Sequence, residues 1–161
     1  MSRCVGVLGL VLLLLCSAVV ADESKTAEGD VQAVIQLLHA YEEAWSRHDA
    51  HAIAGFYYEP AMRVSPAGPS VRATRAMQEA FFSGFLPSLL QQGYATSTWE
   101  HLEVRLLDAN TAVASGVIVR HRGDDSVFQR QGVTYTLWRS EEGWKIFLSA
   151  THSPSTALRF H

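Results

Sequence analysis

Seven histidines are the residues of this chain best suited to proton transfer near neutral pH. His101, His121 and His152 fall in or beside strand-like segments, and each is a candidate acid or base if a bulge turns it into a cavity. A structural role for each is the alternative. His48 and His51 have a spacing that suits a metal on a helix, but they straddle a predicted helix start, with no cysteine or further histidine beside them. We expect no metal site and no cofactor.

Several other chemistries are excluded by the residues themselves. The sequence contains no Gly-x-Ser-x-Gly motif, phosphate-binding loop or dinucleotide fingerprint. Both cysteines, Cys4 and Cys16, lie in an apolar leader, so the rest of the chain has neither a thiol nucleophile nor a disulfide. The 13 Lys and Arg residues are outnumbered by 16 Asp and Glu residues and form no cluster. We therefore expect no nucleic-acid partner.

The leader itself has the pattern of a secretory signal peptide. Arg3 precedes a short apolar run, and small residues around Val19 and Ala21 predict cleavage after Ala21, so that residues 1–21 are removed. We expect a secreted or periplasmic protein with no stable membrane anchor after cleavage. An uncleaved anchor is the alternative, but the run is short for a span of about 20 apolar residues.

Three helices are predicted in the first part of the remaining chain, after a flexible leader at residues 22–29. The first has Asp30 as its N-cap and carries apolar residues at helical spacing: Val31, Val34, Ile35, Leu38, Tyr41 and Trp45. Asp49 caps a short second helix, which ends by Pro60. Thr74 caps a third helix, in which we expect a kink or break near Gly84.

Strand patterns occupy the rest of the chain. A short strand is predicted at residues 62–65 and a brief returning strand around Val71. After Gly93 the pattern alternates, and three long runs at residues 102–106, 111–121 and 127–139 lead by tight turns to a last strand at 144–152. Tight turns require an antiparallel meander. Helices followed by a meander indicate one α+β domain, residues 30–154, with a C-terminal tail at 155–161.

The residues also resemble a known superfamily. The run HAYEEAWSRHDAHAIAGFY at residues 39–57, the strand end Ser65-Pro66 and the run EGWKI at residues 142–146 are similar to nuclear-transport-factor-2-like proteins. These include ketosteroid isomerases, SnoaL-like polyketide cyclases and scytalone dehydratase. The resemblance implies a cone-shaped α+β barrel, a curved antiparallel sheet wrapped around three N-terminal helices with a cavity inside. It also implies homodimers through the outer sheet face, for which a stripe of alternating residues would be suited: Trp99, His101, Glu103 and Arg105.

The catalytic residues of the isomerases carry over only in part. Tyr41 matches their oxyanion-hole tyrosine, whereas Ser65 stands at the position of the general base and Thr136 at that of the second acid. Ketosteroid isomerase needs one aspartate as the base and another kept protonated as a donor. Neither hydroxyl side chain can replace them. We therefore expect no steroid isomerisation, although Tyr41 could orient a carbonyl group.

These observations leave three hypotheses for function. The first is an exported protein that binds a small apolar ligand without catalysis, in a cavity lined by Tyr41, Trp45, Ser65, Phe81, Phe85, Tyr135, Thr136 and Trp138. Arg63, Arg120 and Arg130 are candidate charges at its mouth. The second is a cofactor-free isomerase, cyclase or dehydratase that uses Tyr41 and a strand histidine. The third is a homodimeric interaction module whose cavity is filled. A histidine within hydrogen-bond reach of Tyr41 would favour the enzyme.

Overall fold

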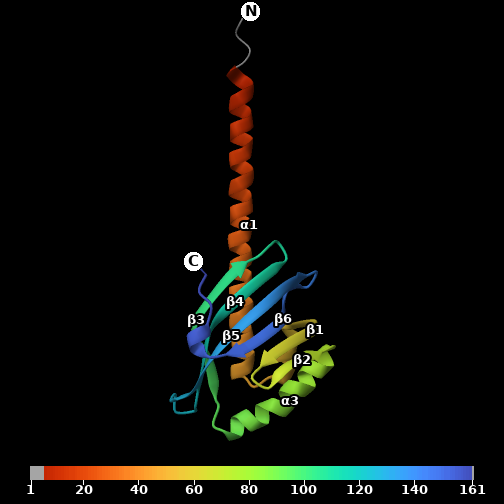
Figure 1. Cartoon of the computed structure of the whole chain (residues 1–161), viewed down its shortest axis with the longest axis vertical. Helices are drawn as coiled ribbons and strands as arrows, with labels where there is room; N and C mark the ends of the chain where they lie inside the picture. Colours follow the sequence, from red (N-terminus) through yellow and green to blue (C-terminus); the bar gives the residue numbers. More distant parts are fainter. Residues whose placement is uncertain (1–5, 161) are drawn as a thin grey trace, which may run out of the picture.

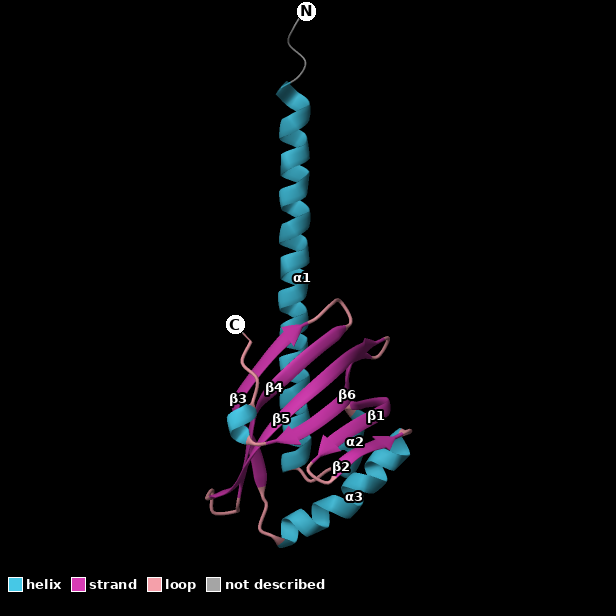
Figure 2. Ribbon diagram, in the orientation of Figure 1, coloured by secondary structure: helices cyan, strands magenta, loops and turns pink. Residues whose placement is uncertain are grey.

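Three helices pack against one six-stranded sheet (Figures 1 and 2). The computed structural model describes residues 6–160, with side chains from residue 26. The helices are α1 (Gly6–Ser46), α2 (Ala50–Gly55) and α3 (Arg75–Gln91). The strands are β1 (Tyr57–Ser65), β2 (Gly68–Arg72), β3 (Thr96–Leu106), β4 (Thr111–His121), β5 (Val127–Ser140) and β6 (Gly143–His152). The sheet is curved and unclosed, which confirms the predicted α+β fold class.

The strand order in the sheet is β2-β1-β6-β5-β4-β3. Strands β3 to β6 form the predicted antiparallel meander, because tight turns join each strand to the next. β1 and β2 form a hairpin that joins the meander through β6. The β1–β6 pair is parallel, so the sheet is not antiparallel throughout. The long connection between these two strands permits that pairing.

The helix α1 is longer than the helix predicted to begin at Asp30. It includes residues 22–29, for which we expected a flexible leader, and four residues of this segment are good helix formers: Glu23, Lys25, Ala27 and Glu28. Asp30 therefore lies inside the helix and is not an N-cap. Its carboxylate instead forms an ion pair with Arg139 of β5.

The predicted signal peptide falls partly outside the described residues. Its residues 1–5 lie beyond them, and the rest belongs to the start of α1. Among the described residues, no helix has both the length and the apolar character needed to cross a membrane. Cleavage after Ala21 and export stay predictions.

Two helix starts are confirmed by their capping bonds. The Asp49 carboxylate accepts a hydrogen bond from the Ala52 backbone N–H at 2.9 Å, and Thr74 Oγ1 accepts one from the Met77 N–H at 3.3 Å. Of the kink or break expected near Gly84, the break is absent, since α3 is a single helix, and the kink stays a prediction.

The first strand begins earlier than predicted. β1 starts at Tyr57, where we had expected residues 62–65, and Pro60 lies within it. Pro60 falls where the pairing with β6 is irregular, between Tyr57 and Met62. Proline has no N–H to donate to a sheet, so such an irregularity is a position that tolerates it.

The core lies between α1 and the concave face of the sheet. Leu38 of α1, Ile53 of α2, Leu137 of β5 and Ile146 of β6 are all inaccessible to solvent. Burying a side chain of this size contributes about 1.5–3 kcal/mol. This packing fixes α1 across the sheet, so that one stripe of the helix faces the strands.

A β-bulge decides which residues of β3 face this core. The pairing with β4 shifts between Trp99 and His101, opposite Ile118 and Val117, and Gly116 is the next residue along β4. A β-carbon at Gly116 would collide with the His101 carbonyl oxygen, so the close approach requires glycine. Trp99 packs against the core on the concave side, and its indole N–H donates to the Leu38 carbonyl at 3.4 Å. The predicted dimer stripe is therefore wrong for Trp99.

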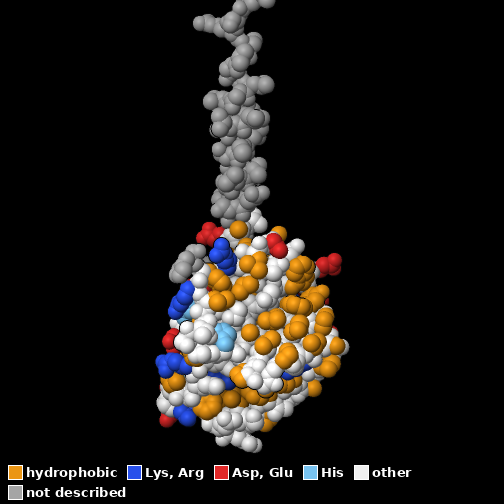
Figure 3. All heavy atoms as spheres, in the orientation of Figure 1, with side chains coloured by type: hydrophobic (Ala, Val, Ile, Leu, Met, Phe, Trp, Pro, Cys, Tyr) orange, Lys and Arg blue, Asp and Glu red, His pale blue; other side chains and the backbone are white. Residues whose placement is uncertain are grey.

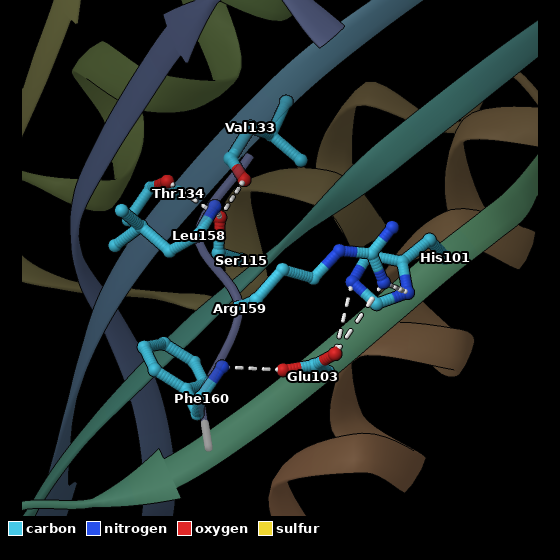
Figure 4. Close-up of polar contacts among 8 residues, drawn as sticks. All are labelled: His101, Glu103, Ser115, Val133, Thr134, Leu158, Arg159 and Phe160. Atoms are coloured by element: carbon cyan, nitrogen blue, oxygen red, sulfur yellow. Dashed lines mark hydrogen bonds and ion pairs between the residues drawn. The ribbon is translucent and has the colours of Figure 1, made fainter. Parts of the chain in front are cut away.

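The C-terminal tail lies along the outer face of the sheet (Figure 4). The Phe160 N–H donates to Glu103 Oε2 at 2.6 Å, and the Leu158 N–H donates to Ser115 Oγ at 2.9 Å. Arg159 contacts both His101 and Glu103. His161 lies outside the described residues. The tail therefore covers His101 and Glu103, two residues of the stripe predicted to form a dimer interface. Homodimerisation stays a prediction.

Candidate functional site

A cavity of about 60 Å³ lies between the concave face of the sheet, α1 and α3. Its walls are mostly aromatic, and its remaining lining is polar or charged. The lining residues are Tyr41, Glu42, Trp45, Tyr57, Arg63, Arg72, Phe81, Phe82, Phe85, Ser97, Ile118, Arg120, Gln131, Val133, Tyr135, Ser149 and Thr151. Accessible space of this size holds several water molecules.

Five of the eight residues predicted to line a cavity lie around this one. They are Tyr41 and Trp45 on α1, Phe81 and Phe85 on α3, and Tyr135 on β5. Tyr41 and Trp45 are four residues apart, as are Phe81 and Phe85, so each pair lies on one side of its helix. The rings of Phe81 and Phe85 stack at 5.8 Å, and Trp45 meets Phe85 edge-on at 6.2 Å.

The other three predicted residues lie elsewhere. Ser65 is at the end of β1, where its hydroxyl donates to the Gly68 carbonyl at 3.4 Å in the turn to β2. Thr136 and Trp138 alternate with the inward Tyr135 and Leu137 on β5, so they point to the outer face, and Trp138 is 42% exposed. Thr136 was assigned to the cavity through the resemblance. The alternation of side chains along β5 turns it to the opposite face.

Three tyrosines form the floor of the cavity. The hydroxyls of Tyr41 and Tyr57 lie 2.7 Å apart, and Tyr135 meets the Tyr41 ring edge-on at 6.0 Å. Burial raises the pKa of Tyr41 well above its ordinary value, and Tyr57 and Tyr135 add to that shift. Burial likewise raises the pKa of Tyr57 and of Tyr135. All three hydroxyls therefore stay protonated at neutral pH and can donate hydrogen bonds.

Three arginines surround the cavity beside these rings. The guanidinium carbon of Arg72 lies 3.7 Å from the centre of the Phe81 ring, and that of Arg63 lies 5.5 Å from it. Arg120 lies over Trp45 at 5.4 Å. Arg63 and Arg120 were predicted at the mouth. Arg130 was predicted there too, but it pairs with Glu100 at 2.7 Å and is not part of the lining.

Glu42 is the carboxylate of the lining, next to Tyr41 on α1. Burial raises the pKa of Glu42, although His39, one turn earlier and 3.4 Å away, acts to lower it. Sequence reasoning missed Glu42, Tyr57 and Arg72. Helical spacing could have found Glu42, since it lies three residues before Trp45, but Tyr57 and Arg72 lie on strands whose bounds the sequence left uncertain.

The three strand histidines lie away from this cavity. His101, His121 and His152 pair across the sheet with Val117, Thr96 and Gly132, on its outer face. Figure 3 shows this face, where apolar side chains gather over the β1 and β6 side of the sheet. The Tyr41 hydroxyl bonds to Tyr57, and no histidine is among the described lining residues. Among the described residues, no histidine forms a hydrogen bond with Tyr41.

His48 and His51 have different partners. His48 Nε2 lies 2.8 Å from the Ala95 carbonyl, whereas His51 pairs with Glu79 at 2.9 Å. Within residues 26–160, no three His, Cys, Asp or Glu side chains come together in a way that could hold a metal ion.

Comparisons with known proteins identify the family. A family model described as NTF2-like protein (DUF6841) matches residues 28–154. No curated protein matches the chain. Among solved structures, an NTF2-like protein with a cystatin-like fold from Novosphingobium aromaticivorans is 17% identical with a TM-score of 0.62, over 94% of this chain and 90% of that one.

Two further structures are similar in the same way. A domain of unknown function with a cystatin-like fold from Nostoc punctiforme is 18% identical, with a TM-score of 0.64 over 78% of this chain and 77% of that one. A proposed dehydratase of the NTF2-like family from Streptomyces avermitilis is 17% identical, with a TM-score of 0.61 over 79% and 96%. At such identities the likeness shows a shared fold, and it does not show whether an activity is shared.

Proposed function

The chain belongs to the NTF2-like family DUF6841, and from that premise we propose that it binds a small organic molecule in its aromatic cavity. The observation that carries this proposal is the lining, in which rings from two helices and two strands surround a few polar groups. Such a combination is typical of ligand sites, because apolar walls contribute burial and a few polar groups fix orientation.

The size of the cavity limits the ligand. Its volume of about 60 Å³ is well below the ~300–1,000 Å³ of sites for drug-sized ligands. A cavity of about 150 Å³ holds benzene, so a single ring requires a small movement of the wall side chains, whereas a multi-ring skeleton would require a much larger one. This supports the expectation that steroids are not substrates.

Binding is favoured over acid–base catalysis by the position of the histidines. The enzyme hypothesis needs Tyr41 beside a strand histidine, but the Tyr41 hydroxyl bonds to Tyr57 and all three strand histidines lie on the other side of the sheet. Relatives that share the fold include a proposed dehydratase, and fold alone does not transfer that activity. We also propose that the protein acts outside the cytoplasm, on the basis of its leader.

Calorimetric titration with neutral single-ring compounds, acetophenone and cyclohexanone, tests the proposal. Thr151→Leu adds bulk at the cavity wall, and Thr136→Leu adds the same atoms on the outer face. We expect saturable binding to the unmodified protein and to Thr136→Leu, and about tenfold weaker binding to Thr151→Leu. Absence of binding by every single-ring compound, or equal binding by both variants, would refute a ligand site here.

A further inference from the structure

We propose that the ligand of this cavity is a small carboxylate, held by Arg63, Arg72 and Arg120 through its anionic group and by the aromatic wall through its apolar body. This inference rests on the proposed function and narrows it to one class of ligand. Nothing in the sequence resemblance required it, because that resemblance pointed to a carbonyl group at Tyr41.

The first support is an unbalanced charge. Among residues 26–160, none of these three arginines forms an ion pair with an acid. Four arginines elsewhere do so: Arg47 with Glu43, Arg130 with Glu100, Arg139 with Asp30 and Arg159 with Glu103. The one carboxylate in the described lining, Glu42, pairs with His39. The cavity therefore collects cations that the chain itself does not neutralise.

These cations also lie close enough to repel one another. Burial lowers the pKa of Arg72 and of Arg120, and the charge of Arg63 lowers both further. Holding like charges together in a partly buried site is unfavourable unless an opposite charge compensates them. A bound anion would supply that charge.

The second support is the way the guanidinium groups are held. Arg72 and Arg63 lie over Phe81, and Arg120 lies over Trp45 at 5.4 Å and Tyr94 at 5.8 Å. Contact with aromatic faces orients each planar group while its N–H bonds point along the plane. Within the described part of the chain, the side chains of Arg63 and Arg72 make no hydrogen bond, so their guanidinium donors are available to a planar acceptor. A carboxylate matches this fork with two oxygens.

The third support is a pair of polar atoms without partners. Arg120 Nε and Thr151 Oγ1 are buried and make no hydrogen bond, and both residues line the cavity. Buried polar groups are normally paired, so two orphan atoms at one site indicate a ligand with acceptor groups. The aromatic wall favours a carboxylate on an apolar body over an inorganic anion, because phosphate has no apolar surface to bury there.

A matched set of ligands and variants tests the proposal by calorimetry. The ligands are benzoate, its neutral analogue benzamide, and inorganic phosphate. The variants are Arg63→Gln and Arg72→Gln, with Arg130→Gln as a control, since Arg130 pairs with Glu100 outside the cavity. Melting temperatures measured on each variant separate loss of binding from loss of folding. Arg72→Lys keeps the charge but lacks the planar fork.

We expect benzoate to bind at least about tenfold more tightly than benzamide, and each cavity variant to weaken benzoate by about tenfold or more. The affinity for benzamide should change by less than about twofold in the cavity variants. Arg130→Gln should bind benzoate as tightly as the unmodified protein does. The affinity of Arg72→Lys for benzoate should lie between that of the two glutamine variants and that of the unmodified protein. Added salt should weaken benzoate binding.

Three results would overturn the proposal. Equal affinity for benzoate and benzamide, with both binding, would refute the carboxylate while leaving the proposed ligand site standing. Phosphate binding as tight as benzoate, with the same dependence on Arg63 and Arg72, would indicate a general anion site. Absence of binding by benzoate, benzamide and the neutral ketones would refute the proposed function itself.

Discussion

The two faces of one sheet differ in chemistry, although they alternate along the same strands. On β5, Tyr135 faces the concave side and lines the cavity, whereas its neighbour Thr134 faces outward. The concave side carries aromatic rings and cations, and the outer side carries the three strand histidines. The sheet therefore separates the three strand histidines from the cavity that could hold a substrate, and Glu42 is the carboxyl group on the cavity side.

The outer face uses its polar groups to hold the C-terminal tail. Ser115 Oγ lies 2.9 Å from Thr134 Oγ1, which lies 2.9 Å from His152 Nε2. The Leu158 N–H donates to the same Ser115 oxygen (Figure 4). His152 thus has a structural partner on its own face. The comparison shows that a count of histidines in the sequence does not tell which face of the sheet carries them.

The largest expected effect concerns the bulge that separates the two faces. In Gly116→Ala, the new β-carbon would collide with the His101 carbonyl and press on the Trp99 ring. We expect a loss of about 2–3 kcal/mol in the free energy of unfolding, as for overpacking in a core. Gly123→Ala is the control, since open space surrounds Gly123. Urea denaturation measures the free energy of unfolding of both variants. Equal stability of the two would show that the close approach at Gly116 does not determine which side chains of β3 face the core.

The next effect comes from the three tyrosines of the cavity floor. Their pKa values are raised in the folded protein, so the unfolded chain loses these protons first as the pH rises above about 10. Stability should be full below that pH and should fall progressively above it. Urea denaturation at pH 8 to 11 measures the slope, which Tyr57→Phe should reduce. A free energy of unfolding that stays constant up to pH 11 would contradict burial of these hydroxyls.

A smaller loss is expected for one hydrogen bond on the concave face. Tyr41→Phe removes the bond between Tyr41 and Tyr57 and should lower the free energy of unfolding by about 1 kcal/mol. Combining it with Tyr57→Phe should add little, because both changes remove the same bond. Thermal denaturation of the single and double variants checks this. Additive losses would mean that the two hydroxyls act independently.

The smallest effect concerns the tail on the outer face. The pKa of Glu103 is lowered, first by the backbone N–H of Phe160 and then by Arg159. Removal of residues 157–161 should therefore raise the pKa of Glu103 toward its ordinary value without altering ligand binding. Carboxyl NMR titration of both proteins measures the change. An unaltered Glu103 titration would place the tail elsewhere in solution.

Much of the fold was predictable because it depends on local interactions. The caps at Asp49 and Thr74 follow from a side chain and a backbone N–H three residues apart, and tight turns fixed the meander. The parallel β1–β6 pair, the bulge at Trp99 and the docked tail join residues distant in sequence, and no local pattern records such contacts.

The site was predictable where periodicity was regular. Helical spacing located Tyr41, Trp45, Phe81 and Phe85, whereas Ser65 and Thr136 were assigned through the resemblance and lie elsewhere. Trp138 is three residues after Tyr135 on the same strand, so the alternation of side chains puts the two on opposite faces. Tyr57 and Arg72 were missed because the hairpin of β1 and β2 brings them beside the helices only in the folded chain.

One measurement tests the difference between the faces most directly. Aromatic NMR signals of labelled tyrosine and histidine can be followed while benzoate and acetophenone are added to the full chain. A ligand site on the concave face predicts saturable shifts at Tyr41, Tyr57 and Tyr135, with the signals of His101, His121 and His152 unchanged. Saturable shifts at the histidines, with the three tyrosines unchanged, would place binding on the outer face and contradict the account.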